Sequence, residues 1–392
     1  MSVNSLVTAN DQYPIEGVSS ILSHAHAMVA DRGYEKPLLL ISADQLKLNA
    51  QHFMAALPGV HPHFAVKSNP DQRVLSILHK QGVSFEIASY DELKLLLDLG
   101  VSGEEIFYSN PIKSEAYLRK AAKKGVQWYA VDSVAEVQKI HGIYPDASLY
   151  LRIKTSNDGS AWPLDNKFGV EGQEAYDVLS ECVRLDMDIS GITFHVGSQC
   201  LNVNNWRQGI RSARLFFHWM RQQGITPRLL NLGGGFPVQL HSDVPSLERI
   251  GKVITKELSV FDELGKFGAA INVIAEPGRN LVASAGCMIA QVIGTAVRHG
   301  QHWLYLDTGV YSGLMELNDR FQYPIYTDRE GPMMNWSIAG PTCDSIDVCI
   351  KNQALPKTMQ PGDLIYLPYM GAYTACCATR FNGFPIPEVV MV

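Results

Sequence analysis

The sequence lacks long apolar runs, clusters of basic residues and cysteine pairs with metal-ligand spacing, and each absence excludes a class of protein. No stretch approaches the roughly 20 apolar residues that span a bilayer, so we expect no membrane protein. The seven cysteines are scattered except for the adjacent Cys376 and Cys377, which argues against a disulfide framework and against zinc. A net charge of -6 without a Lys/Arg-rich run argues against nucleic acid as a partner.

The remaining bulk properties are those of an ordinary globular protein. Hydrophobic residues make up 46% and charged residues 18% of the 392 residues, a length that suits two domains. Residues 1–17 are acidic and polar and lack the basic-then-apolar pattern of a signal peptide. With no disulfide pattern either, we expect a cytoplasmic protein.

Short apolar runs alternate with longer amphipathic stretches over most of the chain. The runs are residues 37–41, 63–66, 83–88, 106–109, 126–131, 148–153, 189–195, 228–232 and 271–276. Helical patterns between them include residues 90–99 and 114–124. Without the first run, eight remain, the number that closes a (β/α)8 TIM-like barrel. An open doubly wound sheet is the alternative, and polar residues at the ends of many successive runs favour the barrel.

The pattern changes after Arg279. Strand-like runs at residues 282–285, 288–296, 303–306, 335–339 and 364–367 are separated by Gly, Pro and Asp turns with little helical periodicity. We therefore expect a barrel domain over residues 36–279 and a C-terminal antiparallel β domain over 280–392. Residues 1–35 have no place in the barrel and are expected to join the β domain.

Lys67 follows a buried apolar run in the segment FAVKSNP. A lysine at the end of a core strand either extends its amine to solvent or is held for chemistry. Desolvation favours the neutral amine, which can attack an aldehyde and hold a cofactor covalently.

Two further strand ends carry candidate cofactor ligands. Three glycines at 233–235 expose backbone N–H groups that can cradle a phosphate, and the alternative, a tight turn, requires fewer glycines than are present. Glu276 and Arg279, in the segment AEPGR, form either a surface ion pair or a site in which Glu276 pairs with a ring nitrogen and Arg279 helps to bind phosphate. These readings stay open on the residues alone.

Polar residues at other loops extend the candidate site. His195 is either a hydrogen-bonded structural residue or a ring that stacks on a planar cofactor, with Ser198 close enough to meet phosphate. Cys343 and Asp344 lie in a Gly-Pro loop that is more polar than a buried cysteine requires, so the thiol can deliver a proton and the carboxylate can bind an amine. Tyr373 offers a phenol to phosphate.

Taken together, these motifs resemble the fold type III pyridoxal-phosphate decarboxylases, and within them the ornithine and lysine/ornithine decarboxylase branch. The motifs AVKSN, HVGSQ, GGGFP, AEPGR, GPTCDSID and GAYT followed by FNGF occur in the same order, over residues 35 to 385. The resemblance implies an alanine racemase-like architecture, with a TIM-like barrel followed by an antiparallel β domain. It also implies pyridoxal 5'-phosphate as the cofactor.

The resemblance implies roles for individual residues. Lys67 is similar to the lysine that holds the cofactor covalently, Glu276 to the acid that pairs with the pyridine nitrogen, and His195 to the imidazole that stacks on the ring. Cys343 matches the proton donor at Cα. The remaining matches are the phosphate ligands Ser198, Gly235, Arg279 and Tyr373, with Gly278 in the adjoining turn, and the substrate ligands Asp319, Asp344 and Tyr311. The loop of Cys343 and Asp344 reaches the partner's barrel in this family, which implies a homodimer with active sites at the subunit interface.

The implied reaction is decarboxylation of a small cationic amino acid, L-ornithine to putrescine and also L-lysine to cadaverine, in polyamine biosynthesis. A diamino-acid conjugate of siderophore biosynthesis is an alternative substrate. An amino-acid racemase of this fold uses Arg at the pyridine nitrogen and a catalytic Tyr, so Glu276 and Cys343 count against it. A non-catalytic regulator typically loses cofactor-site residues, which are present here. Glu86 and Gln199, where Asp and Gly are usual, suggest a bacterial-type enzyme and leave the substrate open.

Overall fold

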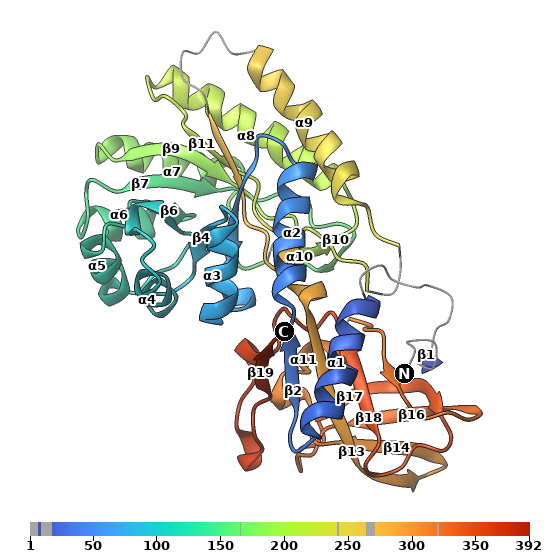
Figure 1. Ribbon diagram of the computed structural model, residues 1–392. Helices are drawn as coiled ribbons and strands as arrows, with labels where there is room; N and C mark the ends of the chain where they lie inside the picture. The colour runs from blue at the N-terminus through green and yellow to red at the C-terminus, as the bar shows by residue number, and fades with distance from the viewer. Residues whose placement is uncertain (1–6, 9–17, 165, 241–242, 264–270, 320) are drawn as a thin grey trace. The chain divides into compact units, whose positions relative to one another are not determined.

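A computed structural model describes residues 7–8, 18–164, 166–240, 243–263, 271–319 and 321–392 (Figure 1). The chain divides into two compact units. The sheet unit combines residues 1–46, 238–243 and 282–392, and the barrel unit combines residues 47–237 and 244–281. Among the described residues, no helix is both long and apolar enough to cross a membrane.

The barrel unit is built on a closed barrel of eight parallel strands. They are β3 (His61–Ala65), β4 (Ser84–Ile87), β5 (Ile106–Tyr108), β6 (Trp128–Val131), β7 (Ser148–Arg152), β9 (Asp188–Thr193), β11 (Leu229–Asn231) and β12 (Asn272–Ala275). The barrel closes where β12 pairs with β3. The predicted (β/α)8 barrel is thus confirmed, and each barrel strand falls within two residues of a predicted run.

Helices surround these strands on the outside (Figure 1). They are α2 (Ala43–Ala56, within this unit from Lys47), α3 (Gln72–Lys80), α4 (Tyr90–Asp98), α5 (Glu115–Lys123), α6 (Val134–His141), α7 (Gly172–Arg184), α8 (Asn204–Gln222) and α9 (Leu247–Glu263). Serine caps start several of them: Ser89 Oγ accepts from the Glu92 N–H at 3.2 Å and Ser114 Oγ from the Tyr117 N–H at 3.2 Å. Each cap satisfies an N–H that the helix leaves unpaired. The helices predicted at 90–99 and 114–124 begin at these two caps.

Side chains fill the barrel interior in layers. One buried apolar cluster consists of Phe107, Ala130, Tyr150, Leu229 and Ile274, each from a different strand. Because side chains alternate along a strand, the residue two positions further on faces the same way. Those residues are Ser109, Asp132, Arg152, Asn231 and Glu276. A polar layer therefore follows the apolar layer toward the carboxyl ends of the strands.

The sheet unit contains a nine-stranded sheet. Its strands are β1 (Val7–Thr8), β2 (Leu38–Ile41), β13 (Gly286–Arg298), β14 (Gln301–Leu306), β15 (Tyr326–Thr327), β16 (Met333–Ala339), β17 (Val348–Pro356), β18 (Leu364–Pro368) and β19 (Glu388–Met391). Helix α1 (Val18–Arg32) packs on β13 and β18, and β1 pairs with β15. The unit also contains the short helix α11 (Met315–Asp319), whereas α10 (Arg279–Val282) belongs to the barrel unit up to Leu281.

Three details of this unit differ from the sequence-based expectation. The sheet is mixed rather than antiparallel, because β14 pairs with β16 and β19 with β2 in parallel. Strand β2, placed at the start of the 36–279 segment, pairs with β13 and β19 and so belongs to this sheet. Residues 282–285, predicted as a strand, form the end of α10 and the 3-10 turn Ala283–Ala285. A four-residue apolar run does not distinguish a buried helix from a strand.

Candidate active site

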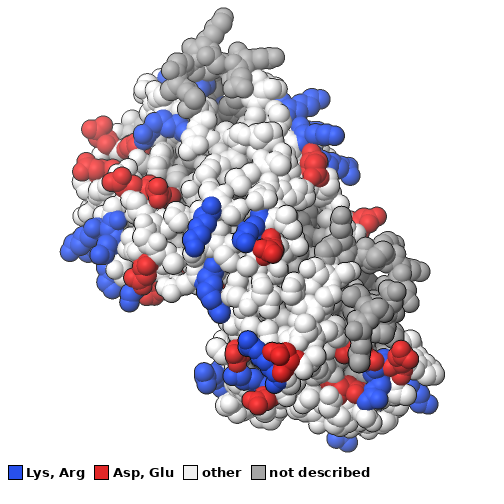
Figure 2. All heavy atoms as spheres, in the orientation of Figure 1, with Lys and Arg blue, Asp and Glu red and all other residues white. Residues whose placement is uncertain are grey.

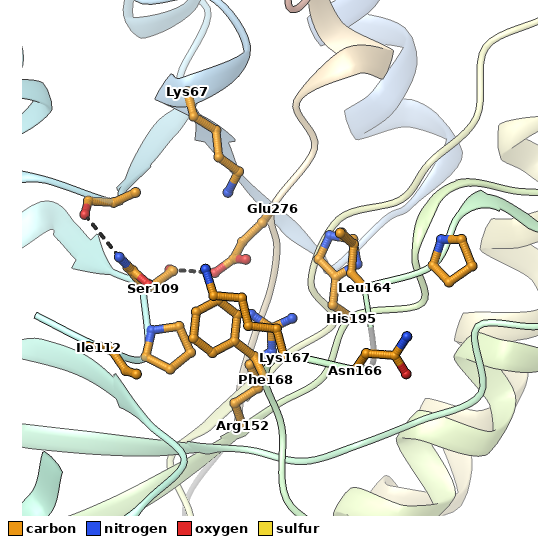
Figure 3. Close-up of a pocket in the computed structure, with 14 residues that line it drawn as sticks. Lys67, Ser109, Ile112, Arg152, Leu164, Asn166, Lys167, Phe168, His195 and Glu276 are labelled. Atoms are coloured by element: carbon orange, nitrogen blue, oxygen red, sulfur yellow. Dashed lines mark hydrogen bonds between the residues drawn. The ribbon is translucent and has the colours of Figure 1, made fainter. Parts of the chain in front are cut away.

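A cavity of about 620 Å³ opens at the carboxyl ends of the barrel strands and lies entirely within the barrel unit. Its walls include Lys67, Ser109, Arg152, His195 and Glu276, together with residues of the loop that follows β8 (Ser160–Trp162) (Figure 3). Lys67 and Glu276 point into the same cavity from the segments that follow β3 and β12, which are neighbours in the barrel (Figure 3). The carboxyl ends of barrel strands are where this fold places its active sites.

Lys67 is held by a buried acid. It lies in the 3-10 turn Val66–Ser68 that follows β3, and its Nζ donates to Glu86 Oε1 at 2.5 Å. The Glu86 side chain is only 1% exposed, whereas that of Lys67 is 46% exposed. Burial raises the pKa of Glu86 to about 7, and the neighbouring ammonium of Lys67 opposes that rise. The amine of Lys67 is thus accessible and has a proton acceptor within reach.

Glu276 is fixed by two donors on one of its oxygens. Its side chain is 9% exposed, and Oε1 accepts from Ser109 Oγ at 2.6 Å and from Asn231 Nδ2 at 2.6 Å. Asn231 Oδ1 accepts from the Gly233 N–H at 2.9 Å, so its NH2 group must face Glu276. Ser109 and Asn231 were not predicted as site residues. Nothing local marks them, because only the folded barrel brings the ends of β5 and β11 close enough to β12 for their side chains to reach Glu276.

His195 presents a neutral imidazole to the cavity. Burial, followed by the positive charges of Arg152 and Lys67, holds its pKa well below the usual range. Its Nδ1 accepts from the Gly197 N–H at 3.0 Å, so the ring proton is on Nε2. An uncharged ring of fixed tautomer is suited to stacking on a planar cofactor.

The triple-glycine loop packs so closely against its surroundings that side chains are excluded. A Cβ on Gly233 would lie 2.0 Å from Phe194 O, and one on Gly235 would lie 2.2 Å from Gly197 O. Both glycines also have positive φ, +62° and +94°. The loop adjoins Ser198, which begins β10 (Ser198–Cys200), because the Cys200 N–H donates to Gly235 O at 3.0 Å. These contacts and φ angles support the tight-turn alternative, and phosphate binding by this loop stays a prediction.

The segment after Glu276 crosses close to Lys67. A Cβ on Gly278 would lie 3.1 Å from the Cβ of Ser68, and the Ala65 N–H donates to Pro277 O at 3.1 Å. Arg279 is 5% exposed and begins α10. A buried guanidinium in this position is not the surface ion pair that the sequence left open.

The other predicted residues gather in the sheet unit. Cys343 is exposed, and its Sγ lies 3.2 Å from Asn382 Oδ1. The Tyr311 hydroxyl donates to Asp344 Oδ2 at 2.6 Å, and donation from the Ile346 N–H and from Tyr311 lowers the pKa of Asp344. The structure thus brings Cys343, Asp344 and Tyr311 into one cluster.

Asp347 anchors this cluster. Its carboxylate accepts from the Val310 N–H at 2.8 Å and from the Thr342 N–H and Oγ at 3.0 and 2.7 Å. It therefore joins the turn before Tyr311 to the loop that carries Cys343. Tyr373 lies in the same unit with φ +54°, and Asp319 ends α11 with its side chain outside the described residues.

Comparisons with known proteins show the family of this chain. The family model for the pyridoxal-binding domain of pyridoxal-dependent decarboxylases matches residues 43–283. The chain belongs to this family. It is 33% identical to lysine/ornithine decarboxylase of Selenomonas ruminantium over 91% of this chain and 89% of that protein. It is 34% identical to antizyme inhibitor 2 of Xenopus laevis over 85% of this chain and 75% of that protein.

A solved structure shows the same fold. The arginine decarboxylase of Paramecium bursaria Chlorella virus, bound to agmatine, matches with a TM-score of 0.88 and 29% identity, over 94% of this chain and 100% of that one. Because the matching family is pyridoxal-dependent, pyridoxal 5'-phosphate is the cofactor of this decarboxylase, and the barrel cavity fits it. An accessible amine, a buried carboxylate facing the same cavity, a neutral ring and a glycine loop are the groups that such a cofactor needs.

Proposed function

We propose that this decarboxylase acts on a small cationic L-amino acid, with L-ornithine as its main substrate and L-lysine as a second, in polyamine biosynthesis. The observation that carries the proposal is one cavity in which Lys67 and the buried Glu276 face each other (Figure 3). The relative named lysine/ornithine decarboxylase supports a substrate with a distal ammonium, as does the half-buried carboxylate of Asp344, which lies between the exposed Cys343 and Ser345.

The barrel residues hold the cofactor in this proposal. Lys67 attaches it through its amine, and Glu86 accepts the proton that the amine gives up. Glu276 pairs with the protonated ring nitrogen and His195 stacks on the ring. Bound pyridoxal phosphate then supplies a sink for the electrons of the broken Cα–carboxylate bond. The phosphate ligands are Ser198, Gly235 and Arg279 of the barrel unit, the adjoining turn at Gly278, and Tyr373.

Residues of the sheet unit act on the substrate. Cys343 protonates Cα after CO2 has left, and Asp344, oriented by Tyr311, binds the distal ammonium together with Asp319. The exposed position of Cys343 supports a homodimer in which this loop completes the partner's site. All seven cysteines are free thiols, which supports a reducing, cytoplasmic location.

A substrate panel tests the proposal. We expect CO2 release from L-ornithine and L-lysine, and at least about 100-fold lower kcat/KM with diaminopimelate, whose distal carboxylate would meet Asp344. L-Arginine and 2,4-diaminobutyrate complete the panel. The substitution Asp344→Asn is expected to raise KM for ornithine about tenfold or more, since a charged hydrogen bond is lost. Asp31→Asn, an exposed change in the same unit, serves as the control.

Two results would contradict this assignment. A preference for a substrate without a distal amine would remove Asp344 from its role. Cofactor binding without CO2 release from any of the five compounds would overturn the substrate class.

Cys343→Ala is expected to change the products more than the consumption of substrate. Without the thiol, protonation at Cα loses its donor, and product should be diverted to oxidative or transamination by-products while kcat falls about 10- to 100-fold. Product analysis by mass spectrometry measures the ratio of diamine to by-products. Ser345→Ala, an exposed change in the same loop, is expected to leave that ratio unchanged. Clean decarboxylation by Cys343→Ala would remove Cys343 from its role.

A further inference from the structure

A chain of hydrogen bonds that starts on β7 ends at Glu276. The Tyr150 hydroxyl of β7 lies 2.8 Å from Ser109 Oγ, and Ser109 Oγ donates to Glu276 Oε1 at 2.6 Å. Figure 3 shows the Ser109 side chain directed at the Glu276 carboxylate. In the barrel order, two strands separate β5 from β12, and β7 lies two strands beyond β5. The chain therefore crosses the barrel interior rather than following one edge.

The number of protons on each hydroxyl group fixes the direction of donation along this chain of hydrogen bonds. A serine hydroxyl has one proton, and Ser109 uses it on the Glu276 carboxylate. Burial, with the nearby charge of Glu276, raises the pKa of Tyr150 well above its usual value, so the phenol keeps its proton. Tyr150 must then donate to Ser109, and Ser109 to Glu276. Successive donations in one direction polarise each other and strengthen the last bond.

The donors select one carboxylate oxygen. Asn231, whose amide orientation is set by Gly233, donates to the same Oε1 that Ser109 contacts. Glu276 Oε2 receives no hydrogen bond from any residue that the structure describes. Rotation of the carboxylate would break both bonds to Oε1. Oε2 is thus left as the acceptor for a ligand in the cavity.

We propose that Ser109 and Tyr150 are positioning residues that orient the Glu276 carboxylate so that Oε2 meets the ring nitrogen of pyridoxal phosphate. This inference rests on the pairing of Glu276 with that nitrogen in the proposed function. Neither residue touches the ring nitrogen in this scheme. Tyr150 acts through Ser109, and Ser109 acts through Glu276.

The test compares two cofactors on the full chain freed of bound cofactor. Dissociation constants are measured for pyridoxal phosphate and for its 1-deaza analogue, in which C–H replaces the ring nitrogen. The wild type should prefer pyridoxal phosphate about 10- to 100-fold, the range for a hydrogen bond to a charged group. Ser109→Ala should reduce that preference about tenfold and Tyr150→Phe about threefold, while binding of the deaza analogue stays nearly constant. Ser109→Thr, which keeps the hydroxyl, should retain the preference.

A second buried tyrosine provides the matched control. Tyr129 of β6 is also fully buried, and its hydroxyl donates to Val126 O at 2.9 Å. Tyr129→Phe therefore removes a buried phenol outside the chain and should leave the preference intact. A merely structural role for Tyr150 would predict equal losses for both cofactors, which would overturn the inference.

The possible results distinguish the positioning role of Ser109 and Tyr150 from the pairing of Glu276 with the ring nitrogen. If the wild type discriminates and both Ser109→Ala and Tyr150→Phe keep the full preference, the positioning role is wrong while the pairing of Glu276 stands. If the wild type and Glu276→Gln bind both cofactors equally, the pairing itself fails and the inference fails with it.

Discussion

Lys67→Ala is expected to abolish the visible absorbance of the lysine-bound cofactor and to lower kcat/KM by at least about 10³-fold, as loss of a covalent catalytic group does. The reason is the position of the amine, which reaches the cavity at the end of β3 and has Glu86 as a proton acceptor at 2.5 Å. An absorbance spectrum of the purified protein and a CO2-release assay measure the two effects. The absorbance needs no substrate, so it tests the attachment separately from the choice of amino acid.

Lys167 supplies the control, because it also lines the cavity. Its amine lies 5.0 Å from the centre of the Phe168 ring rather than beside a buried carboxylate. Lys167→Ala should therefore keep the visible absorbance. Loss of the band in Lys167→Ala with retention in Lys67→Ala would reverse the assignment.

Glu276→Gln is expected to lower kcat about 10²- to 10³-fold with little change in the KM of the amino acid. The amide has nearly the same shape but no charge, so it cannot stabilise a protonated ring nitrogen, a preorganised electrostatic contribution of this size. Steady-state kinetics with ornithine measure kcat and KM separately. Glu174→Gln, an exposed change in α7, is the matched control. Unchanged kcat in Glu276→Gln would remove the acid from the mechanism.

The barrel was predictable because parallel strands are buried on both faces and read as continuous apolar runs. The helices at residues 90–99 and 114–124 were predictable for an equally local reason, their helical periodicity. The sheet unit was harder to predict, since β15 is two residues long and β14 pairs with β16 across an intervening loop and helix. Neither pairing partners nor parallel direction follow from local composition. The net result is a mixed sheet where an antiparallel one was expected.

The residues of the candidate site also differ in whether local sequence could predict them. Lys67 follows an apolar run, and His195 and Glu276 each end one, so their position at a strand end was visible in the sequence. Ser109 and Asn231 have ordinary neighbours and gain significance only through contact with Glu276. Motifs record residues that are adjacent in the chain, whereas these contacts join residues 45 or more positions apart. Such pairs need the closed barrel to be found.

Tyr150 has a consequence for engineering this protein. Its ring belongs to the apolar layer of Phe107, Leu229 and Ile274, and its hydroxyl bonds to Ser109 in the polar layer above. Substitutions that enlarge or shrink the apolar layer would shift the tyrosine ring and with it the hydroxyl. Substitutions in this layer that are meant to raise thermal stability would therefore change kcat, although they change no residue that lines the cavity. Substitutions that raise thermal stability are better made in the outer helices, where repacking leaves the Tyr150 ring in place.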